Sequence, residues 1–211
     1  MLDDLSQHIL DIAENSVAAG ASRVDVRLVE EDDKGFRVLE IRDDGKGMDA
    51  EMVRRVTDPF VTSRTTRRVG LGIPFLKQAA ELAGGSFSIE SVPGSGTCLR
   101  AAFRAGSIDC PPLGDLPATV VTLFVGYPDI RWVFRFSRRE RSFEVDQKDI
   151  LEIIEDPELM RTPPVASWLR DFVREGLEEM RMGGEVRAQS NESGGSSEDQ
   201  GTGERSHIRP L

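Results

Sequence analysis

The stretch Asp43-Asp44-Gly45-Lys46-Gly47 decides how this 211-residue sequence is interpreted. It follows residues 38–41, an apolar run with the pattern of a strand. An acidic side chain therefore stands at the end of a strand, and two glycines follow where the backbone bends or approaches another group closely. Alone, this pattern favours an Asp-Gly turn that closes a hairpin. Its interpretation depends on the motifs that accompany it along the chain.

The composition is typical of a globular protein, with 38% hydrophobic and 30% charged residues. The length suffices for one domain of ordinary size and a smaller second one. No apolar run is long enough to span a bilayer, and the N-terminal Met-Leu-Asp-Asp lacks the basic-then-apolar pattern of a signal peptide. We therefore expect a cytoplasmic protein that does not bind membranes.

The charge and the few metal-binding residue types exclude other classes. A net charge of −10 disfavours binding to nucleic acid, because the phosphate backbone would be repelled. Cys98 and Cys110 are not spaced as metal ligands, and only two histidines, His8 and His207, accompany them. Reduced thiols are thus expected, and a zinc site is not.

A helix is predicted over residues 3–18, because apolar residues recur there at helical spacing. Asp11 and Asn15 are four residues apart and share another face of this helix, and His8 lies on the same side. Such a face suits ligand binding, whereas a solvated helix face is the alternative explanation for Asp11.

The order and spacing of four motifs resemble the nucleotide-binding domain of the GHKL family, which comprises gyrase, heat-shock chaperones, histidine kinases and the MutL mismatch-repair proteins. The resemblance covers residues 1 to about 105, and residues 13–22 are most similar to MutL. Residues 1 to about 182 also resemble small stand-alone histidine-kinase-like ATP-binding proteins of anaerobic bacteria. The motifs are residues 11–15, the opening stretch, Asp58-Pro59-Phe60 and Gly70-Leu71-Gly72.

The resemblance implies an α+β fold, the GHKL or Bergerat two-layer α/β sandwich. In it, a mixed, mostly antiparallel sheet carries helices on one face, and ATP lies between the helix layer and a lid. We expect this domain over residues 1–106, a linker over 107–117, a small C-terminal α+β module over 118–182 and a disordered tail over 183–211, which has almost no apolar residues. Periodicity leaves open whether residues 118–125 form a helix or a strand.

By this resemblance, Asp43 accepts a hydrogen bond from the adenine amino group, and Gly45 and Gly47 let the backbone approach the base. A base without the amino donor would leave a buried carboxylate unpaired, which gives adenine selectivity a physical basis. Met48 is expected to pack on the purine or, equally, to fill the core. The Thr97 hydroxyl is expected near the adenine, although a plain hairpin turn is the alternative at that position.

The resemblance assigns the other motifs to Mg²⁺ and the phosphates. The Asn15 amide oxygen would bind Mg²⁺, which prefers hard oxygen ligands and keeps several waters. Residues 61–69 are interpreted as a short ATP lid, with Phe60 packing beside it and Arg64 reaching the phosphates. Backbone N–H groups of Gly70-Leu71-Gly72, and the positive end of the helix that begins near residue 73, would bind the same phosphates.

Asp11 takes the position at which hydrolytic members of the family carry a glutamate as general base. A base must come within about 2.6–3.2 Å of the water it activates, directly or through another water, so a carboxylate shorter by one methylene implies slow hydrolysis. His8 is expected either to hydrogen-bond and orient Asp11 or to be a surface or structural histidine. A phosphoacceptor role for His8 is disfavoured, since histidine kinases carry that residue on a separate helical hairpin.

The sequence therefore predicts an ATP- and Mg²⁺-binding enzyme that either hydrolyses ATP as a switch or passes its γ-phosphate to a partner protein. The alternative is a non-catalytic ATP sensor whose lid ordering controls a partner. A DNA-repair or topoisomerase-like ATPase is disfavoured by the net charge of −10 and by the missing downstream domains. The partner protein, the phosphoacceptor and the formation of a homodimer stay open.

Overall fold

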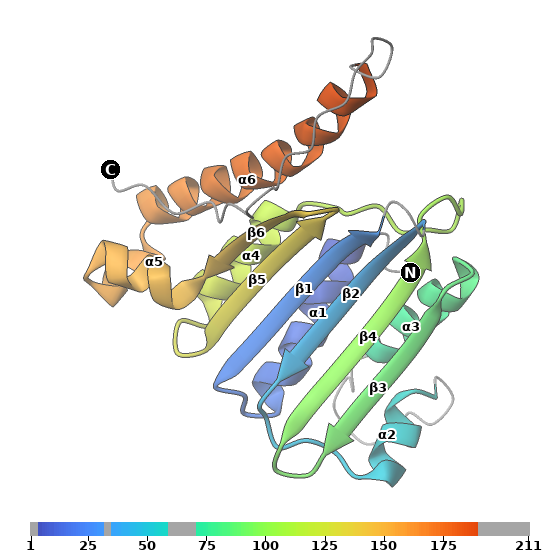
Figure 1. Ribbon diagram of the computed structural model, residues 1–211. Coiled ribbons are helices and arrows are strands. Elements are labelled where there is room, and N and C mark those ends of the chain that lie inside the picture. Colours follow the sequence, from blue (N-terminus) through green and yellow to red (C-terminus); the bar gives the residue numbers. More distant parts are fainter. Residues whose placement is uncertain (1–3, 32–34, 59–70, 190–211) are drawn as a thin grey trace.

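A six-stranded mixed sheet runs through the computed structural model, which describes residues 4–31, 35–58 and 71–189 (Figure 1). The strand order is β3-β4-β2-β1-β5-β6. All neighbouring strands are antiparallel except β1 and β5, which are parallel. The expected mixed, mostly antiparallel sheet is therefore confirmed. Its strands are β1 (Arg23–Glu31), β2 (Phe36–Asp43), β3 (Ser86–Val92), β4 (Gly96–Arg104), β5 (Arg131–Arg138) and β6 (Arg141–Asp146).

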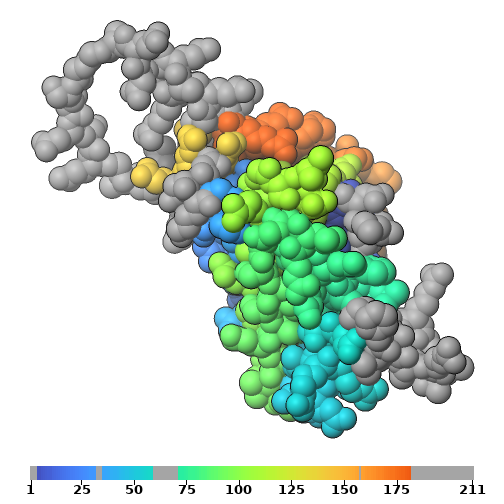
Figure 2. Space-filling view, turned by 90° about the vertical axis from the view of Figure 1, so that its right-hand side faces the viewer, coloured from blue at the N-terminus to red at the C-terminus, as the bar shows by residue number. Residues whose placement is uncertain are grey.

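Three helices cover one face of the sheet, namely α1 (Leu5–Ala18), α3 (Gly72–Leu82) and α4 (Leu116–Gly126) (Figure 1). The short helix α2 (Ala50–Val56) contacts β3, at the edge of the sheet. Figure 2 shows α2, α3, α4 and α6 following one another along the helix side, from cyan through green to orange. At the β6 edge lie α5 (Gln147–Ile154), η1 (Pro157–Arg161) and α6 (Pro163–Gln189). No helix among the described residues is long and apolar enough to cross a bilayer.

The helix layer and the sheet bury one continuous hydrophobic core. The first helix begins at the N-cap Asp4, whose carboxylate accepts a hydrogen bond from the Gln7 N–H at 2.9 Å. Apolar residues recur at helical spacing in α1 and at every second position in β1, so their side chains face the core. The core therefore fixes α1 against the ends of β2 and β4, where the candidate site lies. The buried residues of these two elements include Leu5, Ile9, Ile12, Val24, Val26 and Leu28.

Strands β5 and β6 come from the segment for which the sequence predicts a small C-terminal module, and they extend the sheet of the first half through β1. Residues 118–125, which periodicity left open, are helical in α4, and the Asp115 carboxylate caps this helix by accepting from the Ala118 N–H at 2.9 Å. The boundary predicted at Gly183 differs from the structure, because α6 runs to Gln189. The sequence before Gln189 contains good helix formers, which continue the helix.

Candidate functional site

Three polar residues lie at the ends of β2, β3 and β4 that meet at the lower end of the sheet in Figure 1. Thr97 of β4 lies opposite Asp43 of β2 and opposite Ser91 of β3. The Thr97 and Ser91 hydroxyl oxygens are 2.9 Å apart. Because residues directly opposite in antiparallel strands project to the same face, these groups form one polar surface beneath the helix layer. The structure therefore brings Asp43 and Thr97 together, although 54 positions of sequence numbering separate them.

Two donors fix the carboxylate of Asp43. The Ser16 hydroxyl of α1 donates to Oδ2 at 3.0 Å, and the Gly45 N–H donates to Oδ1 at 2.9 Å. A carboxylate oxygen accepts more than one hydrogen bond, so Asp43 keeps acceptor capacity for a ligand.

Sequence reasoning missed Ser16. The signal in the sequence was its place in the apolar stripe of α1, three residues after Ala13, because a polar group inside such a stripe needs a hydrogen-bond partner. In the structure, Ser16 is 2% exposed.

Asp44 anchors the loop that follows β2. Its carboxylate accepts hydrogen bonds from the Ser22 N–H at 2.7 Å, the Ser22 hydroxyl at 2.5 Å and the Arg23 N–H at 2.9 Å. Burial opposes ionisation, but the hydrogen bonds from Ser22 and Arg23 outweigh it and lower the pKa of Asp44 below its usual value. The Lys46 N–H donates to the Ala19 carbonyl at 3.0 Å, so both ends of this loop are held to the turn after α1.

Gly47 lets the same loop pack on the β3–β4 hairpin. Its φ is +63°, and a Cβ at this position would lie 2.0 Å from the Val92 carbonyl oxygen. No other residue type satisfies both requirements without displacing the backbone. At Gly45, a Cβ would lie 2.9 Å from the Ala19 Cβ and 3.0 Å from Oδ1 of Asp43. The half-buried Met48 follows, and its N–H donates to the Ser91 hydroxyl at 2.8 Å.

Asp11 lies against the first residue of α3. A Cβ on Gly72 would lie 2.8 Å from the Asp11 Cβ and 3.2 Å from its Oδ2. Asp11 is half-buried, and burial, helped by the neighbouring negative charge of Glu14, raises the pKa of its carboxyl group. Asn15 is half-buried one turn further along the same face of α1. Asp11 therefore stands at the start of α3, and Asn15 follows it on the same face of α1.

The start of α3 has no side-chain cap among the described residues. Leu71 occupies the N-cap position and is 40% exposed. The first backbone N–H groups of a helix have no partner within it, and the helix dipole adds positive potential there. Phe60, Arg64, Gly70 and the lid predicted over 61–69 lie outside the described residues.

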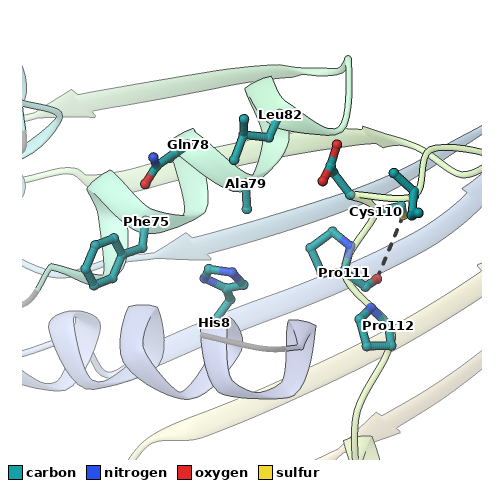
Figure 3. Close-up of a pocket in the computed structure, with 10 residues that line it drawn as sticks. His8, Phe75, Gln78, Ala79, Leu82, Cys110, Pro111 and Pro112 are labelled. Carbon is teal, nitrogen blue, oxygen red and sulfur yellow. Dashed lines mark hydrogen bonds between the residues drawn. The ribbon is translucent and has the colours of Figure 1, made fainter. Parts of the chain in front are cut away.

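Of the two alternatives for His8, the hydrogen bond to Asp11 is not formed, and His8 is a buried histidine. His8 is 1% exposed, and neither of its ring nitrogens has a hydrogen-bond partner among the described residues. The reason is geometric: Asp11 turns to the start of α3 at Gly72, whereas His8 points toward the middle of α3 at Phe75 and Ala79 (Figure 3). Burial lowers the pKa of His8, although the charge of Asp4 opposes this shift.

The donor set near α3 fits Mg²⁺ held jointly with a nucleotide. Within the parts of the chain that the structure describes, no three His, Cys, Asp or Glu side chains converge as a metal site. Mg²⁺ commonly takes one or two protein oxygens and completes its shell with phosphates and water. The Asn15 amide oxygen is a hard donor on α1, which meets that need. Cys98 and Cys110 are free thiols, as expected.

Curated relatives match part of the chain. Sensor histidine kinase YxdK of Bacillus subtilis is 33% identical over 75 residues, which is 34% of this chain and 23% of the kinase. Sensor histidine kinase ZraS of Klebsiella oxytoca is 33% identical over 95 residues, or 44% of this chain and 20% of the kinase. A putative sensor protein of Shewanella frigidimarina is 27% identical over 107 residues, which is 50% of this chain and 16% of the sensor protein. The matched segments thus span less than a quarter of each relative.

Two solved structures match the chain at low sequence identity. The N-terminal domain of a DNA repair protein has a TM-score of 0.47 at 12% identity, covering 69% of this chain and 52% of that one. The MutL ATPase domain of Aquifex aeolicus, complexed with ADP, has a TM-score of 0.42 at 13% identity, and the match covers 74% of this chain and 70% of that one.

Residues 2–107, half of the sequence, match the family described as histidine kinase-, DNA gyrase B- and HSP90-like ATPases. This segment contains α1, the sheet from β1 to β4 and α3, and with them Asp11, Asn15, Asp43 and Thr97. The chain therefore belongs to the family of histidine kinase-, DNA gyrase B- and HSP90-like ATPases.

Proposed function

We propose that this chain binds ATP with Mg²⁺ between α1, the start of α3 and the ends of β2 and β4, and that it hydrolyses ATP or passes the γ-phosphate to a partner protein. The observation that carries the proposal is the arrangement of Asp43. Its carboxylate is fixed by the Ser16 hydroxyl and the Gly45 N–H, and it lies opposite Thr97.

Adenine recognition follows from that arrangement. Asp43 accepts a hydrogen bond from the exocyclic amino group of adenine through the capacity that its two protein donors leave free. A carboxylate that is already oriented loses little conformational entropy when the base binds. Guanine presents a carbonyl oxygen in place of that amino group, so two acceptors would face each other. The site should therefore discriminate against GTP.

The phosphates are proposed to lie at the opposite side of the site, where α3 begins. Its first N–H groups would bind an anion, and Gly72 lets the chain approach α1 closely. Asn15 would hold Mg²⁺ through its amide oxygen, and Mg²⁺ when bound would neutralise phosphate charge. Arg64 in the lid stays a prediction for the γ-phosphate.

Asp11 is proposed as the general base. Its raised pKa makes its carboxylate a stronger base than an exposed aspartate, which favours proton abstraction from water or from a hydroxyl. Removing that proton increases the nucleophilicity of the attacking oxygen, while the backbone groups at α3 orient the phosphates. The short side chain should make turnover slow.

The proposal is tested by calorimetric titration of ATP and Mg²⁺ into wild type, Asp43→Asn and Asp49→Asn. Asp49 is exposed and caps α2 by accepting from the Met52 N–H at 2.7 Å, a role that asparagine also fills. We expect Asp43→Asn to weaken ATP binding at least tenfold, an estimate of about 1.4 kcal/mol for one charge-assisted hydrogen bond, and Asp49→Asn to leave it unchanged. Equal affinities in all three proteins would contradict the nucleotide site.

Turnover is measured separately, as phosphate release from ATP and as transfer of labelled γ-phosphate to protein. Asp11→Asn should abolish either reaction while ATP still binds, and Glu175→Gln, at an exposed position of α6, should not. Tight ATP binding without turnover in the wild type would instead support the non-catalytic sensor.

A further inference from the structure

A second cavity lies between the beginning of α1, the C-terminal half of α3 and the connection at residues 108–112. Its volume is about 240 Å³. Figure 3 shows His8 pointing into it from α1, with α3 above and the two prolines beside it. None of the proposed nucleotide residues lines it, so it is distinct from the site at Asp43. The residues that line the cavity include His8, Phe75, Ala79, Leu82, Cys110 and Pro111.

His8 is the polar feature of this cavity. It is 1% exposed, yet both ring nitrogens are without a hydrogen-bond partner among the described residues. Buried polar groups in folded proteins are nearly always paired, so an imidazole left in this state points to a missing ligand or water. Burial keeps His8 neutral by lowering its pKa. A neutral imidazole offers one donor and one acceptor.

The cavity walls are held in place before any ligand enters. The Leu5 N–H donates to the Pro112 carbonyl at 2.9 Å, and the Ser6 N–H and hydroxyl donate to the Leu113 carbonyl at 3.1 and 2.8 Å. The Arg37 guanidinium donates to the Pro111 carbonyl at 2.8 Å. The connection is therefore fixed to both α1 and β2, which makes the cavity preformed and lowers the entropic cost of binding.

Size, polarity and charge define the ligand. An apolar cavity of about 150 Å³ accommodates benzene, so this one has room for a six-membered ring and a small substituent. Phe75, Leu82 and Pro111 supply apolar surface. Asp109 at the same cavity disfavours an anion, and the neutral His8 offers no charge to attract one. A hydroxyl or carboxamide would satisfy the donor and the acceptor of the imidazole.

We infer that this cavity is a second ligand site, which binds a compact neutral molecule with an apolar ring or branched body and one hydroxyl or carboxamide group that hydrogen-bonds His8. Residues 108–112, which form one wall of the cavity, lie beyond the segment that matches the family. The inference does not depend on the proposed ATP chemistry.

The test uses benzyl alcohol as the probe and toluene as its apolar match, each titrated into the full chain labelled with ¹⁵N-histidine. The chain has two histidines, so His207 is an internal reference for His8. We expect benzyl alcohol to shift the His8 ring nitrogens saturably and to leave His207 unchanged. Toluene should bind about tenfold more weakly, since it cannot replace the missing hydrogen bond.

Two variants close the cavity. Ala79→Leu fills it from α3, and Leu82→Trp covers it at a position that is 55% exposed, where folding is not at risk. The matched control is Ala50→Leu, at the exposed start of α2. Both closing variants should lose the His8 shift, and the control should retain it. The inference is overturned if benzyl alcohol leaves the His8 nitrogens unmoved up to its solubility limit, or if the shift persists in folded Leu82→Trp.

Discussion

The Ser16 hydroxyl lies 3.0 Å from Oδ2 of Asp43, and this hydrogen bond joins α1 to the end of β2. Ser16 follows Asn15 directly in sequence, so one helical turn carries both the contact that orients the carboxylate at the strand end and the residue proposed to hold Mg²⁺. The adenine end and the phosphate end of the proposed site therefore share a single rigid element. A shift of α1 would displace both ends together.

Ser16→Ala should weaken ATP binding about fivefold, because one hydrogen bond of about 1 kcal/mol no longer fixes Asp43. The same change at the exposed Ser86 of β3 is the control and should leave the affinity unchanged. Calorimetric titration of ATP and Mg²⁺ measures both. An unchanged affinity in Ser16→Ala, with an intact fold, would show that the carboxylate is oriented without the helix.

Local chemistry made part of the fold predictable. The sequence predicts a helix over residues 3–18, and α1 spans Leu5–Ala18 with Asp4 as its N-cap. An N-cap can be predicted from sequence because its side chain accepts a hydrogen bond from an N–H only three residues further along the chain.

Contacts between residues far apart in the sequence could not be predicted. Ser16 and Asp43 are 27 residues apart, and the parallel pairing of β1 with β5 joins segments about 108 positions apart. The choice between the two alternatives for His8 depended on packing in the same way. Its spacing from Asp11 indicated a shared face, but the packing of α3 decides that Asp11 meets Gly72 while His8 enters a cavity.

Gly72→Ala should destabilise the protein by about 1–3 kcal/mol, the usual cost of adding a methylene to a filled space. The new Cβ would lie 2.8 Å from the Asp11 Cβ, so α3 must move away from α1. Gly126→Ala is the control, because a Cβ there meets nothing within 4 Å. Denaturant unfolding measures both variants. A loss of stability as small as that of Gly126→Ala would contradict the close approach of α1 and α3.

His8→Leu should reduce the sensitivity of stability to mild acid. The pKa of His8 is lowered in the folded state below its usual value of 6.5, so the unfolded chain binds a proton first as the pH falls. The wild type therefore loses stability from pH 6.5 downward, through the window that ends at the lowered pKa. Leucine removes this loss and also the cost of two unpaired buried nitrogens, so stability at neutral pH should not fall.

Unfolding in denaturant at a series of pH values between about 5 and 8 measures this effect as the difference between wild type and variant. His207→Leu is the control, because it removes the other histidine of the chain. If His8→Leu and the wild type lose stability in parallel as the pH falls, His8 does not titrate with folding.

The length of the carboxylate at position 11 should set the rate of the proposed reaction. Asp11→Glu restores the side chain that the resemblance assigns to hydrolytic members of the family, and it extends the carboxylate by one methylene past Gly72 toward the start of α3. Phosphate release should therefore rise in Asp11→Glu and vanish in Asp11→Asn, with ATP affinity nearly constant in both. Glu175→Asp and Glu175→Gln repeat these changes at an exposed position of α6 and should leave the rate unaltered. Because burial raises the pKa of Asp11, the rate of the wild type should fall on acidification at a pH above the usual aspartate value of 3.8, as the base becomes protonated. A rate that is equal in Asp11→Asn and wild type would remove Asp11 from the chemistry and leave the orientation of the nucleotide as the contribution of α1.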